Sequence, residues 1–337
     1  MKALFIGGTG LISSAVSKLA VERGIELCLL NRGQKSEFFP KGARQIKADN
    51  GDAKAVTEAL RGESFDVVVD WIAFTPDQAA RDIELFSGRT GQFIFISSAS
   101  AYQKPPTRYL ITESTPLANP FWQYSRDKIA CEELLMAAYR EKGFPMTIVR
   151  PSHTYGVTQI PAAVSSWTQP WSLIDRMRRG RPVIVPGDGS SLWTMTHNSD
   201  FAKGFVGLMG NIQAIGHAFH ITSDEVLTWD QIYALIGAAA GVQPDIIHVA
   251  SDFIAAFDPE QRGGLLGDKA RCAVFDNSKI KAFVPGFVTT VPFAAGVRES
   301  VQWFEKHPAQ CAIDDAFNVL CDRIVSAQHA ALAPAGA

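Results

Sequence analysis

The first 150 residues alternate between short apolar runs and segments with helical periodicity. Helical periodicity marks Leu11–Arg23 and Tyr124–Lys142, and each segment ends next to a glycine, Gly24 or Gly143, where a helix C-cap is expected. Alternation of strands with helices is typical of an α/β protein built on a doubly wound parallel sheet. Five apolar runs are the expected buried strands: Ala3–Ile6, Leu27–Leu30, Val67–Val69, Phe93–Ile96 and Thr147–Val149.

The regular alternation ends after Pro151, where proline, glycine and tryptophan become frequent. This change predicts a smaller C-terminal lobe that covers the carboxyl edge of the sheet, where ligands of open α/β sheets bind. We therefore expect a first domain over residues 1–155, to which a segment near 195–225 returns, and a substrate-binding lobe mainly over residues 156–325. Residues 326–337 are expected to form a flexible tail.

Charge and composition narrow the choice of partners. The 337 residues carry a formal net charge of −2, which gives no sign of a nucleic-acid or membrane partner, and no apolar run is long enough to span a bilayer. No signal-peptide pattern is seen, and five cysteines without CxxC spacing favour reduced thiols in the cytoplasm. His217 and His220 lack a third ligand, so no metal is expected. The basic run Arg176–Arg181 is expected to be a solvated helix end.

A glycine-rich turn, GGTGLIS at residues 7–13, follows the first expected strand and leads into an expected helix. Gly7 permits a tight turn, and Gly10 lets the backbone approach a pyrophosphate at the helix N-terminus, where free N–H groups and the helix dipole favour anions. The strand before and the helix after are the context that such a motif requires. The segment, including Leu11 and Ile12, therefore predicts a dinucleotide site.

Tyr124 and Lys128 lie four residues apart in the segment YSRDK, so they share one face of an expected helix. A free tyrosine has a pKa of about 10, which is too high for a base near neutrality. A neighbouring ammonium, together with the positive charge of an oxidised nicotinamide, favours the phenolate. We therefore predict that Tyr124 is the general acid/base and that Lys128 lowers its pKa.

The order of these motifs resembles that of the extended short-chain dehydrogenase/reductases, the NAD-dependent epimerase/dehydratase family. The resemblance covers nearly the whole chain and implies a Rossmann fold with a Ser-Tyr-Lys constellation that oxidises or reduces a secondary alcohol. Five further segments carry it: ADNGD at 48–52, VDWIA at 69–73, FIFISSASAY at 93–102, RPSHTYG at 150–156 and DNSK at 276–279.

The resemblance also implies roles for individual residues. Ser98 aligns with the serine or threonine that binds the substrate oxygen, and Ser100 lies two residues beyond it on the substrate side. His153 takes the place of a substrate-facing asparagine, where it could donate to substrate, titrate near neutral pH, or be structural. The implied cofactor contacts are Asp49 and Asn50 at the adenine, Ile72 and Ala73 along the dinucleotide, Lys128 at the nicotinamide ribose, and Pro151 and His153 beside the nicotinamide.

The end of the second expected strand bears on the choice between NAD and NADP. A carboxylate there would bind the ribose hydroxyls of NAD, whereas an arginine suits the 2′-phosphate of NADP. Here Asn31 takes the acidic position and Arg32 follows it. A guanidinium can bind a phosphate in bidentate fashion, so NADP is favoured over NAD.

Relatives that the resemblance implies mostly bind nucleotide sugars and hold the pyrophosphate with two arginines. Trp193 and Leu265 take those two positions in this sequence. We therefore expect a sugar-like substrate without a diphosphate, with Trp193 stacking on a ring or closing the pocket. Arg262, Lys269 or Arg271 could compensate for the missing charges.

Several alternatives stay open. The same triad serves dehydrogenases and epimerases, including nucleotide-sugar epimerases. The Asn-Arg-Gly after the second strand also resembles chloroplast stem-loop RNA-binding relatives, and a regulator that binds NADP without turnover is a third possibility. The resemblance further implies a homodimer through helices near Pro76–Phe86 and Tyr124–Lys142, where Ile129, Leu134 and Met136 are additional apolar positions.

Overall fold

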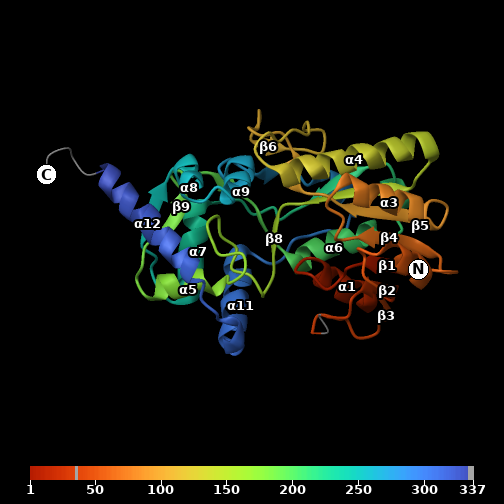
Figure 1. Cartoon of the computed structure of the whole chain (residues 1–337), viewed down its shortest axis with the longest axis horizontal. Helices are drawn as coiled ribbons and strands as arrows, with labels where there is room; N and C mark the ends of the chain where they lie inside the picture. The colour runs from red at the N-terminus through yellow and green to blue at the C-terminus, as the bar shows by residue number, and fades with distance from the viewer. Residues whose placement is uncertain (35–36, 333–337) are drawn as a thin grey trace.

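The computed structural model describes residues 1–34 and 37–332. A seven-stranded parallel sheet forms its N-terminal part, in the order β12-β7-β5-β4-β1-β2-β3 (Figure 1). The predicted doubly wound parallel sheet is confirmed, and each of the five predicted apolar runs lies within one of its strands. The strands are β1 (Lys2–Ile6), β2 (Glu26–Asn31), β3 (Arg44–Lys47), β4 (Phe65–Asp70), β5 (Thr90–Ile96), β7 (Met146–Pro151) and β12 (Ala218–Ile221).

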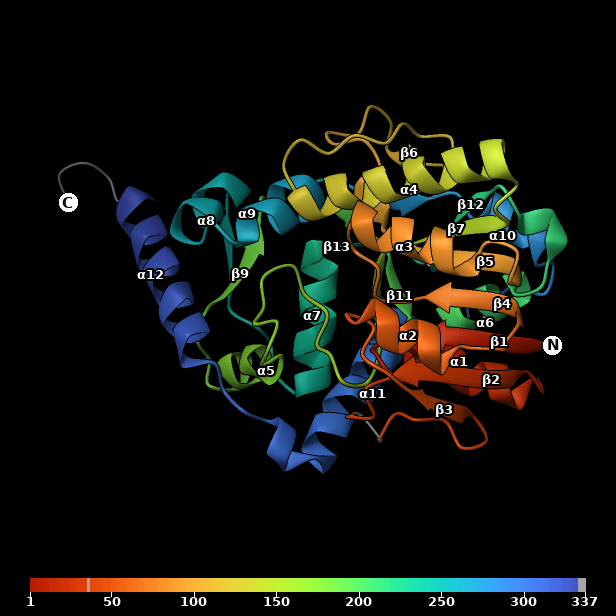
Figure 2. The ribbon, with the colours of Figure 1, turned by 45° about the vertical axis from the view of Figure 1, so that its right-hand side comes forward.

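Helices cover both faces of this sheet (Figure 2). The helices are α2 (Ala53–Ala59), α3 (Pro76–Phe86), α4 (Gln123–Lys142), α1 (Ser13–Glu22), α6 (Asn198–Leu208) and α10 (Ser278–Phe283). One apolar cluster packs helices α2, α3 and α4 against one face of the sheet. A second cluster packs α1, α6 and α10 against the other face. The two glycines that were expected to end helices, Gly24 and Gly143, have positive φ values of 75° and 66°.

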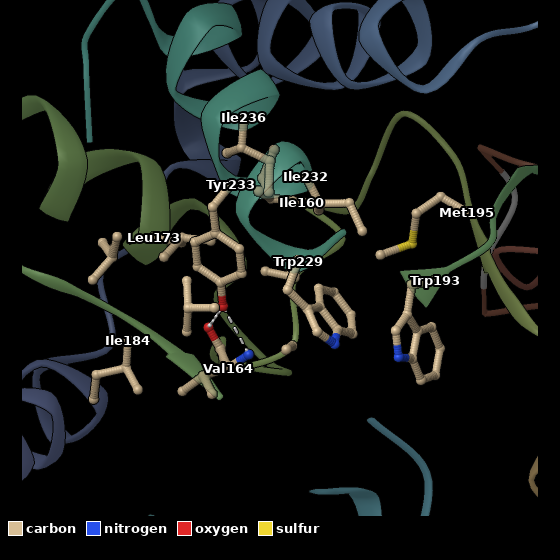
Figure 3. Close-up of a cluster of buried hydrophobic side chains, with 14 of the residues drawn as sticks. Ile160, Val164, Leu173, Ile184, Trp193, Met195, Trp229, Ile232, Tyr233 and Ile236 are labelled. Carbon is tan, nitrogen blue, oxygen red and sulfur yellow. Dashed lines mark hydrogen bonds between the residues drawn. The ribbon is translucent and has the colours of Figure 1, made fainter. Parts of the chain in front are cut away.

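A helical lobe lies beside the carboxyl end of the sheet (Figure 1). Its core contains a parallel strand pair, β9 with β14, and a cluster of buried apolar side chains around Trp229 and Tyr233 (Figure 3). The main elements are α5 (Trp171–Arg178), β9 (Val183–Pro186), α7 (Trp229–Ala240), β14 (Ile246–Val249), α8 (Ser251–Phe257), α9 (Gln261–Gly264), α11 (Phe293–Lys306) and α12 (Asp315–Leu332).

Short elements connect the sheet and the lobe. The strands are β6 (Leu110–Ile111), β8 (His153–Tyr155), β10 (Leu192–Trp193), β11 (Met195–His197), β13 (Leu227–Thr228) and β15 (Val274–Phe275). A π-helical turn covers Leu265–Lys269, and 3-10 turns cover Ala99–Ala101, Ile212–Ala214 and Pro308–Gln310. In the part of the chain that the structure describes, no helix is both long enough and apolar enough to cross a membrane.

Two expectations need correction. The expected tail at 326–337 is helical as far as Leu332, as the continuation of α12, whose buried apolar side chains end at Val325; residues 333–337 lie outside the described part. The run Arg176–Arg181 ends α5 as expected, and Arg178 and Arg179 are exposed, but its first residue is not solvated. Arg176 is fully buried, and its guanidinium donates to Asp322 Oδ1 at 2.5 Å and to the carbonyl of Pro182 at 2.6 Å.

Candidate active site

The glycine-rich turn between β1 and α1 forms one wall of a cavity of about 700 Å³. Gly7 has φ of 98°, in the left-handed region that glycine tolerates, and its N–H donates to the carbonyl of Leu30 at 2.9 Å. A Cβ on Gly8 would lie 2.6 Å from the Leu29 side chain, so only glycine fits there. Ser13 Oγ accepts from the Gly10 N–H at 2.8 Å and fixes the start of α1. The turn therefore presents bare backbone to the cavity.

This cavity brings together most of the residues that the sequence singled out. Ala73 does not line it: that residue is buried, and its carbonyl accepts from Lys128 Nζ instead. His153 lies in an adjoining cavity, described below. The predicted residues that line the cavity are Gly7, Gly10, Leu11, Ile12, Asn31, Arg32, Asp49, Asn50, Ile72, Tyr124, Lys128, Pro151 and Ser98.

At the end of β2, the Asn31 side chain shapes the turn. Its Oδ1 accepts from the Gly33 N–H and from Gln45 Nε2, both at 2.9 Å. Arg32 is exposed at the cavity wall, and Lys47 pairs with Asn31 from the neighbouring strand β3. Two cations therefore lie at the strand end where a carboxylate would discriminate against a 2′-phosphate.

The loop that carries Asn50 is held by a residue that sequence reasoning missed. The Arg81 guanidinium, from α3, donates to the Asn50 carbonyl at 2.5 Å and to Asn50 Oδ1 at 3.1 Å. Asn50 itself lines the cavity. No motif in the sequence marks Arg81, because the contact spans 31 residues.

Tyr124, Ser98 and Lys128 meet at the floor of the cavity, from the start of α4 and the end of β5. Lys128 is almost fully buried, and its Nζ donates to the carbonyls of Ala73 at 2.6 Å and Ile96 at 2.7 Å. An ammonium has three N–H donors, so one remains for a group in the cavity. Burial lowers the pKa of Lys128 to about 8.

The surroundings of the Tyr124 phenol act on its pKa in two opposing ways. Burial raises the pKa of the phenol above its ordinary value, and a hydrogen bond with Ser98 opposes this shift. The Lys128 ammonium donates to the two carbonyls and lies 5.8 Å from the Tyr124 ring centroid. Lowering of the Tyr124 pKa by Lys128 stays a prediction.

A row of serine hydroxyls supports Ser98. Ser125 Oγ donates to Ser100 Oγ at 2.8 Å, and Ser100 Oγ lies 2.8 Å from Ser98 Oγ. Because Ser98 Oγ also accepts from the Ser100 N–H at 3.2 Å, its own proton can point to the cavity. Ser100 is buried and borders the second cavity, but its hydroxyl is already engaged by two serines.

Glu132 joins the three elements that carry the catalytic group. It lies one helical turn after Lys128 on α4, and Ser97 Oγ donates to its Oε1. Arg150, at the end of β7, donates to the same carboxylate through Nε at 2.9 Å and through its terminal nitrogen at 2.5 Å. Tyr124, Lys128 and Glu132 are spaced four residues apart, so they share one face of the helix. This spacing could have identified Glu132 from the sequence.

A second cavity, of about 340 Å³, opens beside Tyr124 and Ser98 toward the lobe. His153 lines it, and burial lowers the pKa of this histidine to about 3. The lowered pKa favours a neutral imidazole in the wall of this cavity near neutral pH. The lobe side of the cavity is formed by Gln159, Trp167 and Asp268 together with Lys269.

Trp193 does not face either cavity, which corrects the expectation that it stacks on substrate. It is 1% exposed, packs against Trp229 at 5.0 Å between ring centroids, and donates from Nε1 to the Arg271 carbonyl at 2.9 Å (Figure 3). Leu265 is equally buried in the same core. Both positions were assigned by counting along the chain, and the indole is drawn inward because its large apolar area is buried there.

Of the three cations named as replacements for the missing arginines, one faces the site. Arg262 and Arg271 are exposed and do not line the second cavity, whereas Lys269 does. His220, which was weighed as a metal ligand, bonds through Nδ1 to the Tyr102 hydroxyl at 3.0 Å. Within residues 1–34 and 37–332, no group of three or more potential metal ligands is found.

The family model described as the NAD dependent epimerase/dehydratase family matches residues 3–222. The chain belongs to this family. The family, the Rossmann-like sheet and the class of NAD-dependent enzymes were predicted from the sequence and are confirmed. NADP as the preferred form of the cofactor stays a prediction.

Two proteins similar to this chain have names that describe different functions. The chain is 27% identical over 261 residues to chloroplast stem-loop binding protein of 41 kDa b of Arabidopsis thaliana. The aligned region covers 73% of this chain and 65% of that protein, which is less than two thirds of its length. It is 24% identical over 255 residues to 2′-dehydrokanamycin reductase of Streptomyces kanamyceticus, covering 76% of this chain and 71% of that protein.

A solved structure shows the same fold. UDP-glucuronic acid 4-epimerase from Bacillus cereus, in complex with UDP-glucuronic acid and NAD, superposes with a TM-score of 0.73 at 17% identity. The match covers 91% of this chain and 100% of that chain. At 17% identity this similarity establishes the fold but not the substrate.

Proposed function

We propose that this protein is an NAD(P)-dependent oxidoreductase or epimerase that acts on a secondary alcohol of a sugar-like substrate. The observation that carries the proposal is the junction of two cavities at Ser98 and Tyr124: one is lined by the glycine turn and the other opens toward the lobe. The bare backbone at Gly7 and Gly8 and the spare donor of Lys128 suit a dinucleotide. A hydride acceptor and an alcohol could thus approach the same phenol.

In this proposal, bound NAD(P) supplies the hydride acceptor or donor. Tyr124 takes the proton of the substrate hydroxyl, or returns it in the reverse direction. Ser98 would donate a hydrogen bond to the same oxygen when Ser100 donates to Ser98 Oγ, in place of its hydrogen bond with Tyr124. Lys128 places a positive charge below the cavity floor and offers its third N–H to a ribose hydroxyl.

Hydride transfer is the direct test. Purified protein would be mixed with either cofactor and a panel of sugars, sugar acids and polyols, and the nicotinamide absorbance followed. The state of the cofactor after purification separates the two reaction types, since an epimerase keeps its dinucleotide and a dehydrogenase exchanges it every turnover. A panel that gives no absorbance change and no epimerised product would contradict the proposal.

We further propose that the substrate carries no nucleoside diphosphate. Trp193 and Leu265 are core residues, so neither can replace an arginine at a pyrophosphate. Each missing charge-assisted contact would have contributed about 1.5–3 kcal/mol. Calorimetry with UDP-, GDP- and dTDP-sugars and cofactor-loaded protein should show no binding in the micromolar range, and micromolar binding of any of them would overturn the idea.

NADP should bind more tightly than NAD, because Arg32 can pair with the 2′-phosphate. Arg32→Ala is expected to lower NADP affinity by about tenfold to a hundredfold, the worth of one charge-assisted hydrogen bond, and to leave NAD affinity almost unchanged. Fluorescence titration of both cofactors measures the gap. Arg61→Ala is a matched control, since that exposed arginine pairs with Glu58 on α2 and does not line the cavity. Equal affinities of the wild type for NAD and NADP would contradict the role of Arg32 at the 2′-phosphate.

Binding of a structured RNA is a second candidate. Its support is the similarity to the chloroplast stem-loop binding protein. The net charge of −2 provides no general attraction to phosphate backbones. A filter-binding titration with a stem-loop RNA at physiological salt distinguishes the candidates, because an enzyme of the kind proposed here should retain none of it.

A homodimer is proposed through α3 and α4, which lie side by side on one face of the sheet (Figure 2). Leu134 and Met136 are half-buried against the core, and Ile129 is half-buried on the same helix. Light scattering at micromolar concentration should give twice the mass of the chain, and Ile129→Glu should shift the mass toward the monomer. A monomeric wild type would refute the dimer.

A further inference from the structure

The wall of the second cavity carries one acidic side chain, Asp268, and one basic side chain, Lys269. Asp268 is the acidic side chain in its wall, and Lys104 Nζ lies 3.4 Å from Asp268 Oδ1. Lys104 is buried and therefore neutralises Asp268. His153 is neutral, since burial lowers its pKa to about 3. Lys269 is then left as a cation without a countercharge of its own.

Lys269 is held rigidly at this wall. It is the last residue of the π-helical turn Leu265–Lys269, an irregular form that often marks functional sites. Trp229 Nε1 donates to the Lys269 carbonyl at 3.0 Å. On the other side, Asn119 Nδ2 donates to the Gly267 carbonyl at 2.8 Å. The backbone that presents this lysine is thus fixed from both the lobe and the sheet domain.

The Lys269 side chain is mostly buried and lines the second cavity, and its ammonium has no polar partner in the part of the chain that the structure describes. Only 5% of the residue is exposed, and across residues 1–34 and 37–332 its Nζ makes no hydrogen bond or ion pair. Its neighbour is the Trp167 ring, at 5.4 Å from Nζ to the ring centroid. Burial lowers the pKa of Lys269, and Asp268 opposes this shift. An unpaired cation in the wall of a cavity gains from a countercharge, so an anionic group of a ligand suits this site.

A second group without a hydrogen-bond partner belongs to the wall of the same cavity. Gln159 lines the cavity, and its Oε1 is buried without a hydrogen-bond partner in the described part of the chain. An amide oxygen can only accept hydrogen bonds, and the same holds for the carboxylate oxygens of Asp268. These acceptors suit hydroxyl groups, while Lys269 suits an anionic oxygen.

We propose that the substrate is a hydroxy acid whose carboxylate binds Lys269 while its reacting hydroxyl lies at Tyr124 and Ser98. This inference rests on the proposed function and names the substrate class of that site. One unpaired cation matches one carboxylate, whereas a phosphate near its dianionic form would keep a charge unmatched. A cationic amino sugar would meet Lys269 with like charge and is excluded from the class.

The test is calorimetry on the full-length, NADP-loaded protein with matched ligand pairs: glucuronate with glucose, and gluconate with glucitol. Glucose 6-phosphate and glucosamine serve as the phosphate and amine probes. At least one acid should bind about tenfold to a hundredfold more tightly than its neutral partner. Lys269→Met should remove that preference and leave the affinity for the neutral partner unchanged, which also reports that the variant is folded.

Arg271→Ala is the matched control, because this exposed neighbouring cation does not line the cavity and its loss should keep the preference. The proposal is overturned if no acid is preferred over its neutral partner, if glucose 6-phosphate binds more tightly than both acids, or if Lys269→Met keeps the preference. Hydride transfer is read separately by nicotinamide absorbance. Acid binding without turnover would leave this anion site standing and reject the proposed oxidoreductase, and turnover of a neutral sugar without acid preference would do the reverse.

Discussion

Replacing Tyr124 with phenylalanine is expected to lower kcat by about two to four orders of magnitude, the usual worth of a general acid/base. The change removes one hydroxyl and keeps the ring between Trp122, at 4.9 Å, and Phe74, at 6.4 Å between centroids. The fold and cofactor affinity should therefore stay close to wild type. Steady-state kinetics on a turned-over alcohol, with a cofactor titration beside it, measure both quantities.

Ser125→Ala provides a graded comparison for Tyr124→Phe. Ser125 is fully buried and reaches Ser98 only through Ser100, so its loss should reduce kcat far less than loss of the phenol. Wild-type turnover by Tyr124→Phe would show that the proton is carried by another group. A large rise in KM with unchanged kcat would instead assign Tyr124 to uniform substrate binding.

The sheet was readable from the sequence because its inner strands are buried on both faces. Every residue from Ala3 to Ile6 is fully buried, which leaves an uninterrupted apolar run. Strand β3 was not predicted, since it lies at the sheet edge and only Ile46 of its four residues is buried. An edge strand with polar residues carries little periodic signal.

The cofactor side of the site could be predicted because its residues belong to short motifs attached to strand ends. The substrate side could not, since it depends on where the lobe folds back. Trp193 is buried in the lobe core, while Lys269, 76 positions later in the sequence, lines the same cavity as Tyr124. Neither placement follows from spacing along the chain. Arg176 illustrates the same limit, because a basic run looks solvated until its partner Asp322 on α12 is known.

Loss of the Glu132 carboxylate is expected to be the most damaging single change to stability. Glu132 and Arg150 are 4% and 6% exposed at their side chains, so the pair is shielded from water. Glu132→Gln keeps the shape but leaves the Arg150 guanidinium buried without its countercharge. Removal of one partner from such a pair costs about 3–5 kcal/mol in the free energy of unfolding.

A double variant separates the charge from the packing. Glu132→Gln combined with Arg150→Met removes both charges, and it should recover much of the lost stability because no unpaired ion remains. Denaturant unfolding of the wild type, both single variants and the double variant gives the coupling energy between the two residues. If Glu132→Gln unfolds at the wild-type midpoint, the carboxylate is not what holds β5, α4 and β7 together. Ser97 precedes Ser98, and Glu132 follows Lys128 by one helical turn. A variant destabilised at Glu132 should therefore also have a lower kcat. The kcat of the double variant shows whether repacking alone restores the positions of Ser98, Tyr124 and Lys128.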